Sequence, residues 1–146
     1  MGEATTLRGS CHCGRLHIAL ATRRAFARIV PRACDCSFCR KHGSVWISDP
    51  AGQLRISASD ADALREYEQG SNAAKFLLCG RCGVLVAAIF RHASRLYGVA
   101  NAGCLDGNAA LGAPVPASPQ SLGADEKIAR WQQLWIPDVL LETTGN

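Results

Sequence analysis

Alternation of apolar and polar residues is the clearest pattern along this chain. Between Leu16 and Leu20 an aliphatic residue takes every second position, which is typical of a strand with one buried face. Further short apolar runs predict strands at residues 26–30, 45–48, 54–57, 84–90 and 95–100, and residues 75–78 lead into the last cysteine cluster. Residues 63–69 fit either a strand or a turn of helix. Many short strands separated by turns indicate a mainly β fold built from antiparallel sheets.

The C-terminal part of the chain has a different pattern. Residues 112–123 contain three prolines and predict an extended surface loop. Apolar residues then recur at helical spacing across residues 125–135, and Pro137 ends the run, which predicts one C-terminal helix. We expect Trp131 and Trp135 to pack on the sheet, with a wall of a ligand site or a subunit interface as alternatives.

Length and composition indicate an ordinary globular protein. The chain has 146 residues, of which 48% are hydrophobic and 19% charged, as in a single domain with its own core. We expect one domain over residues 1–146, with its core at about 8–106. No apolar run approaches the roughly 20 residues of a membrane span. The N-terminus has neither the basic nor the apolar stretch of a secretory signal, so we expect a cytoplasmic protein. The oligomeric state stays open.

Seven of the eight cysteines fall into three short clusters. In a reducing compartment such clusters are metal ligands or catalytic thiols more often than disulfides. Cys11 and Cys13 form the first cluster, and Cys79 and Cys82 form the third; a glycine follows each. Together they supply the four thiolates of a closed tetrahedral site, which predicts a structural zinc. A thioredoxin-type redox pair in the third cluster is the alternative, but apolar strand residues follow it where such a pair requires a helix.

The middle cluster is different because it supplies three thiolates within six residues. Cys34, Cys36 and Cys39 predict a second zinc site with an open position, since catalytic zinc combines three protein ligands with one exchangeable ligand. These three cysteines are therefore the candidate catalytic residues. The fourth ligand is water or a substrate thiol, with His42 and Cys104 as alternatives that would close the site. A group of reactive thiols without a permanent metal is a further alternative.

The charge of the chain bears on its partners. Arg40 and Lys41 follow the middle cluster; their charges would lower thiol pKa values and favour an anionic substrate, unless they form a solvated surface pair. The net charge is +4, and two thiolate-rich zinc sites would bring the protein close to neutrality. Near-neutral charge and an aromatic content of 6% do not favour binding to nucleic acid.

Three motifs carry a family resemblance, and they occupy residues 9–14 (GSCHCG), 34–43 (CDCSFCRKHG) and 76–83 (FLLCGRCG). With them, the stretch from about Arg8 to Asp106 resembles the glutathione-dependent formaldehyde-activating enzyme family, which shares its domain with the centromere protein V group. The resemblance implies antiparallel sheets of the Mss4-like type around a structural zinc. It also implies that the cysteines of the first and third motifs hold that zinc, and that those of the second motif hold a catalytic zinc.

The resemblance further implies an activity. The family joins glutathione to formaldehyde, giving S-hydroxymethylglutathione, and is classed with the carbon–sulfur lyases. An open zinc site suits this chemistry, because coordination removes the proton of a thiol and the thiolate attacks a carbonyl carbon. We therefore expect a zinc-dependent carbon–sulfur lyase that acts on a small thiol. The alternatives are a zinc-stabilised binding module for a protein or an RNA, and a glutathione carrier without turnover.

Overall fold

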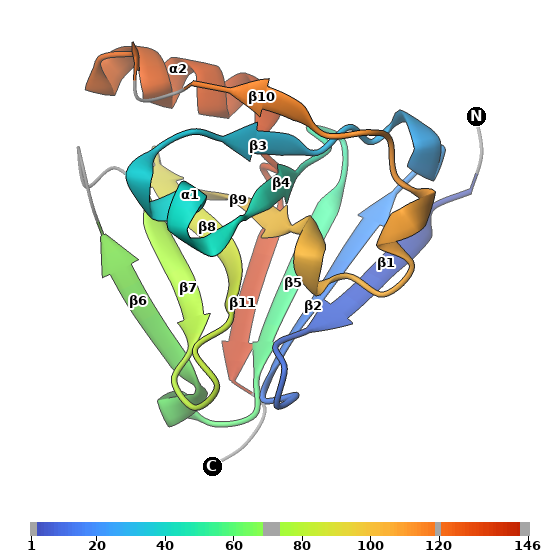
Figure 1. Ribbon diagram of the computed structural model, residues 1–146, viewed down its shortest axis with the longest axis vertical. Helices are drawn as coiled ribbons and strands as arrows, with labels where there is room; N and C mark the ends of the chain where they lie inside the picture. The colour runs from blue at the N-terminus through green and yellow to red at the C-terminus, as the bar shows by residue number, and fades with distance from the viewer. Residues whose placement is uncertain (1–2, 69–73, 119–120, 144–146) are drawn as a thin grey trace.

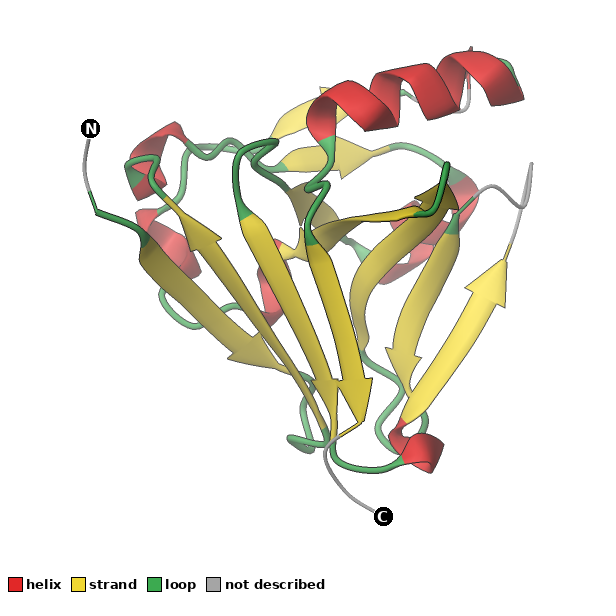
Figure 2. Cartoon of the chain, turned by 180° about the vertical axis from the view of Figure 1, so that it is seen from behind, coloured by secondary structure: helices red, strands yellow, loops and turns green. Residues whose placement is uncertain are grey.

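Two β-sheets form the body of the protein in the computed structural model, which describes residues 3–68, 74–118 and 121–143 (Figures 1 and 2). The four-stranded sheet has the order β1 (Thr5–Ser10), β2 (Leu16–Thr22), β5 (Gln53–Ala58), β11 (Val139–Thr143). The seven-stranded sheet has the order β10 (Val115–Ala117), β3 (Arg32–Cys34), β4 (Val45–Ile47), β9 (Arg95–Asn101), β8 (Leu85–His92), β7 (Lys75–Cys79), β6 (Leu64–Glu68).

Helices occupy the ends and connections of the sheets. Helix α2 (Ala124–Leu134) lies across the end where the strands fan apart (Figures 1 and 2), and α1 (Ser37–His42) is a short helix between β3 and β4. Short 3-10 turns are η1 (Phe26–Arg28), η2 (Ala61–Ala63), η3 (Ala102–Cys104) and η4 (Asn108–Ala110). Two backbone hydrogen bonds of 2.9 Å join Gly98 to Ile136, which fixes the end of α2 over β9.

The pattern of buried residues follows from how each strand is covered. In β2 every second residue is buried, beginning with Leu16, because only one face of this sheet packs against the core. In β8 six successive residues from Leu85 to Phe90 are buried. Val86 and Ile89 belong to the core between the sheets, whereas Leu85 and Phe90 pack with the aromatic side chains under α2. A strand covered on both faces needs such a continuous apolar run.

The structure confirms a mainly β fold with one main C-terminal helix. The sheets are mixed rather than wholly antiparallel, because β10 pairs with β3, and β11 with β5, in parallel. The strand predicted at residues 26–30 is wrong, since residues 26–28 form η1. The ambiguous segment 63–69 contains strand β6, and its last residue lies outside the described residues.

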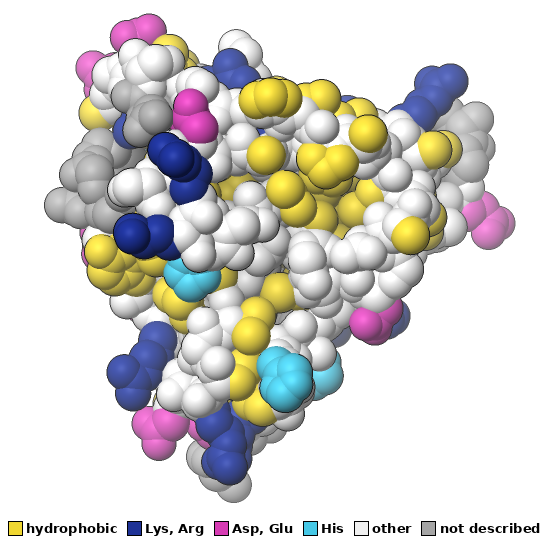
Figure 3. Space-filling view, in the orientation of Figure 1, with side chains coloured by type: hydrophobic (Ala, Val, Ile, Leu, Met, Phe, Trp, Pro, Cys, Tyr) yellow, Lys and Arg dark blue, Asp and Glu magenta, His cyan; other side chains and the backbone are white. Residues whose placement is uncertain are grey.

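The predicted loop at residues 112–123 contains the short edge strand β10; its residues 119–120 lie outside the described part of the chain. Pro114 and Pro116 have no backbone N–H, and an edge strand tolerates this because its outer side needs no partner. Hydrophobic side chains gather over β3 and β10 on the face shown in Figure 3, and the exposed large hydrophobic residues of the chain include Val115 of β10. Neither helix of the described residues has the length and apolar content of a membrane span.

Candidate metal centres

Four cysteine side chains meet where the turn after β1 approaches the turn after β7. The sulfur atoms of this four-cysteine group, Cys11, Cys13, Cys79 and Cys82, all lie within 4.8 Å of one another. The sulfurs of Cys11 and Cys13 are 3.7 Å apart, and those of Cys13 and Cys79 are 3.5 Å apart. Sulfurs around zinc at the usual distance of about 2.3 Å would be about 3.8 Å apart. The group therefore fits a tetrahedral zinc ion.

The two turns that carry these cysteines share a design. Each ends at a glycine with positive φ, 84° at Gly14 and 80° at Gly83, a conformation that only glycine adopts without strain. The turn aims backbone N–H groups at the sulfurs: Leu16 donates to Cys11 at 3.3 Å, and the two residues before Gly83 donate to Cys79 at 3.3 and 3.4 Å. Such donors stabilise thiolates, which is the form that binds metal.

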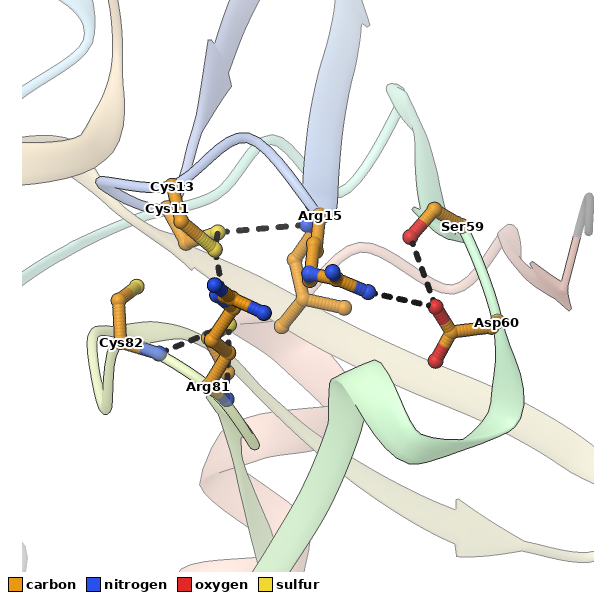
Figure 4. Close-up of polar contacts among 9 residues, drawn as sticks. Cys11, Cys13, Arg15, Ser59, Asp60, Arg81 and Cys82 are labelled. Atoms are coloured by element: carbon orange, nitrogen blue, oxygen red, sulfur yellow. Dashed lines mark hydrogen bonds and ion pairs between the residues drawn. The ribbon is translucent and has the colours of Figure 1, made fainter.

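The pKa values of the four-cysteine group differ in direction, so some of its cysteines ionise to thiolates more readily than others. Burial raises the pKa of Cys11 to about 11. Burial also opposes ionisation of Cys79 and Cys82, but backbone N–H groups outweigh it and lower both pKa values, to about 6 for Cys82. Figure 4 shows Arg15 directed toward Asp60, with which it pairs at 2.8 Å beside the group.

Cys34, Cys36 and Cys39 form the second group, hereafter the three-cysteine group, and their sulfurs also lie within 4.8 Å of one another. Local sequence produces this arrangement. Cys34 ends β3, and Cys36 caps α1 by accepting the N–H of Cys39 at 3.4 Å. Gly43 ends the helix with a φ of 62°. The cap and the short helix thus bring three sulfurs from six residues to one point.

Hydrogen bonds within the three-cysteine group favour one thiolate. A hydrogen bond with Cys34 is the main cause that lowers the pKa of Cys39 to about 5, although burial opposes the shift. The indole Nε1–H of Trp46 also donates to the Cys39 sulfur, at 3.4 Å. The same bond with Cys39, together with burial, raises the pKa of Cys34. A thiolate already present at neutral pH suits a metal ligand.

Neither alternative fourth ligand joins the three-cysteine group. Among the described residues, no further Cys, His, Asp or Glu places a ligand atom within reach of all three sulfurs. The ring of His42 packs against Phe38, with 4.5 Å between ring centroids. Cys104 donates its S–H to the carbonyl of Leu85 at 3.2 Å. The group thus offers three protein ligands, as an open metal site requires.

A cavity of about 330 Å³ adjoins the three-cysteine group, a size in the range of small-molecule sites. All three tryptophans of the chain line it, together with apolar side chains and the cations Arg32, Lys127 and Arg130. Its lining residues are Arg32, Cys34, Cys36, Ser37, Cys39, Trp46, Ala74, Phe76, Ala88, Val99, Ala117, Lys127, Arg130, Trp131, Leu134 and Trp135.

Sequence reasoning predicted the cysteines of both groups but not the cations of the cavity. Arg40 and Lys41 are exposed on α1 and do not line the cavity. Trp131 and Trp135 do line it, and they also pack against Phe90 with ring centroids 5.4 and 5.1 Å away. The expected packing of the helix on the sheet is confirmed, and the same two side chains form a wall of the cavity.

Comparison with protein families matches residues 6–118 to the family described as glutathione-dependent formaldehyde-activating enzyme. This range contains both cysteine groups but not helix α2. The fold is similar to the crystal structure of a Rhodobacter sphaeroides protein, with a TM-score of 0.56 and 28% sequence identity, over 74% of this chain and 99% of that chain. The comparison with curated proteins gave no match.

Proposed function

Because the chain belongs to the glutathione-dependent formaldehyde-activating enzyme family, we propose that it is a zinc-dependent carbon–sulfur lyase. It joins a small thiol, with glutathione as the family's substrate, to formaldehyde. The observation that carries this proposal is the position of the three-cysteine group in the wall of a cavity large enough for a small molecule. None of the eight cysteines forms a disulfide, which supports a reducing cytoplasm as the compartment.

The two cysteine groups have different roles in this proposal. The four-cysteine group holds a structural zinc, because its ligands come from two distant turns and complete a tetrahedron. The three-cysteine group holds the catalytic zinc. That zinc would supply an open position that favours the thiolate form of a substrate thiol.

The reaction itself needs little else from the protein. The sulfur lone pair of the substrate forms a bond to the carbonyl carbon of formaldehyde, the C–O π pair moves to oxygen, and that oxygen takes the proton lost by the thiol. The walls formed by Trp46, Phe76 and Trp135 exclude water and hold the thiol for attack. The cations of the cavity offset the negative charge of a thiolate. The reverse sequence cleaves the C–S bond.

The test measures exchange between glutathione and S-hydroxymethylglutathione at equilibrium by NMR, because formaldehyde adds to thiols unaided and only acceleration identifies an enzyme. Zinc-loaded protein should accelerate the exchange, and Cys36→Ser should abolish the acceleration. Cys104→Ser is the matched control, since this cysteine lies outside both groups. Thiol binding without acceleration would overturn the lyase proposal in favour of a carrier.

A further inference from the structure

The cavity beside the three-cysteine group is strongly asymmetric in charge. Three of its lining residues, Arg32, Lys127 and Arg130, are cations, and none of its described lining residues is Asp or Glu. Residues 69–73 and 119–120, which lie outside the described ranges, also contain no Asp or Glu in the sequence. A zinc ion with the three thiolates of the three-cysteine group would contribute only one net negative charge, so the three cations leave the cavity positive and favour an anion.

These cations are free to bind a ligand. The ion pairs in the described part of the chain involve Arg15, Arg24, Arg55 and Lys75, so none of them engages a cation of the cavity. A guanidinium that is partly withdrawn from water and has no counter-ion is a favourable site for a carboxylate, which it can bind through two parallel hydrogen bonds.

The position of Arg32 is set by neighbouring elements. It is half-buried in β3 and donates from Nη2 to the Ser48 hydroxyl at 2.9 Å. That hydroxyl donates to the carbonyl oxygen of Leu134 at 2.6 Å, so the chain of bonds joins β3 to the end of α2. The guanidinium group of Arg130, from α2, lines the same cavity. An anion bound between the two guanidinium groups would remove their mutual repulsion.

The rest of the wall is apolar and aromatic. Trp46, Phe76, Trp131 and Trp135 line the cavity, so the ligand presents an apolar body to them. Trp131, Trp135 and two of the cations lie on or next to α2, beyond the residues that the family match covers. The part of the wall that α2 supplies therefore lies outside the range that the family match covers.

We propose that the cavity selects thiol acids: thiols that carry a carboxylate on an apolar body and no ammonium group, with Arg32 and Arg130 binding the carboxylate. This inference rests on the proposed function, because the thiol must reach the three-cysteine group. Glutathione carries two carboxylates and one ammonium group. Its carboxylates suit the cations, but its ammonium group meets three like charges and no Asp or Glu on the described lining, where the thiolates of the three-cysteine group are the negative partners. The aromatic walls attract an ammonium group, whereas the three cations of the cavity repel it.

The decisive comparison uses glutathione and its deamino analogue, glutaryl-cysteinylglycine, which differ only in the ammonium group. Binding to zinc-loaded protein is measured by tryptophan fluorescence, since all three tryptophans line the cavity, and in parallel by calorimetry. The deamino analogue should bind about tenfold more tightly. A second pair, 2-mercapto-3-phenylpropanoate and 2-phenylethanethiol, tests the carboxylate on an apolar body, and the acid should bind more tightly.

Variants identify the residues responsible. Arg130→Gln and Arg32→Gln should each weaken binding of the thiol acids by about tenfold and weaken binding of 2-phenylethanethiol much less, because that thiol has no carboxylate to lose a partner. Arg95→Gln is the matched control, because Arg95 is exposed and does not line the cavity. Arg32→Gln removes the hydrogen bond to Ser48 and can therefore affect folding. Arg130 is exposed, so Arg130→Gln tests the inference without that complication.

The outcomes separate this inference from the proposed function. Glutathione binding as tightly as its deamino analogue, while thiol–formaldehyde exchange is still accelerated, would overturn the selectivity and leave the lyase standing. Equal losses with the acid and with 2-phenylethanethiol in Arg130→Gln would overturn the role of that residue. Failure of every thiol to bind by both methods, with no acceleration, would overturn both proposals.

Discussion

Replacing one cysteine in each group should distinguish a structural metal from a catalytic one. Cys13→Ser and Cys39→Ser each remove one sulfur and leave a hydroxyl of similar size. Cys13 is exposed, whereas Cys39 is 2% exposed. Cys39→Ser therefore carries the extra cost of a buried hydroxyl, which by itself would make Cys39→Ser the more destabilising substitution. We expect Cys13→Ser to be the more destabilising of the two.

The expected difference follows from the length of chain that each metal ties together. Cys13 and Cys79 are 66 positions apart, whereas the three-cysteine group spans residues 34–39. The entropy of closing a loop grows with the logarithm of its length, so the longer tether contributes about 2 kcal/mol more to the free energy of unfolding. For a chain of this size that difference corresponds to about 7 °C in melting temperature.

The assay is thermal unfolding followed by circular dichroism at saturating zinc, with bound zinc counted by elemental analysis. Cys13→Ser should lose one zinc and melt about 7 °C lower than Cys39→Ser. Cys39→Ser should also lose one zinc, yet keep the wild-type spectrum. Equal destabilisation by the two substitutions, or a larger loss in Cys39→Ser, would refute the division of labour between the groups.

Three further predictions test the metal sites and the fold. Elemental analysis should find two zinc ions per chain, and titration with glutathione followed by dialysis should remove one; retention of both would contradict an open site. Trp46→Phe removes the N–H that reaches the Cys39 sulfur and should weaken metal binding by the three-cysteine group about tenfold in a chelator competition, while unchanged affinity would contradict the role of the indole. Gly9→Ala should lower the free energy of unfolding by about 2–3 kcal/mol in urea, because a Cβ there would overlap the carbonyl oxygen of Cys104. Gly103→Ala is the matched control, since a Cβ at Gly103 meets only ordinary contacts, and an equal effect of the two would exclude the steric reason.

Local patterns along the chain were sufficient to predict much of the fold. Alternation identified β2, and a continuous apolar run identified β8, because burial on one face or on both leaves a direct trace in sequence. Helical spacing identified α2 to within one residue at each end. Strand β11 was not predicted, because it pairs in parallel with β5 after an intervening helix, and parallel pairing depends on contacts distant in the chain.

The sequence by itself determined which cysteines belong together. Spacing of two or three residues places sulfurs on one turn, and this geometry is local, so the three-cysteine group needs no distant contact to form. The sequence also indicated that two pairs complete one four-sulfur set, because zinc requires four ligands.

Only the tertiary structure decided what faces the three-cysteine group. Trp46 comes from β4, and Arg130 and Trp131 come from α2, and no spacing rule relates residues so far apart in the chain to the cysteines of residues 34–39. These residues meet because α2 crosses the end of the seven-stranded sheet. The position of α2 is set by the packing of buried aromatic side chains and by the hydrogen bonds between Gly98 and Ile136. Periodicity records whether a side chain is buried, but which distant side chains share a cavity is determined by the packing of the whole chain.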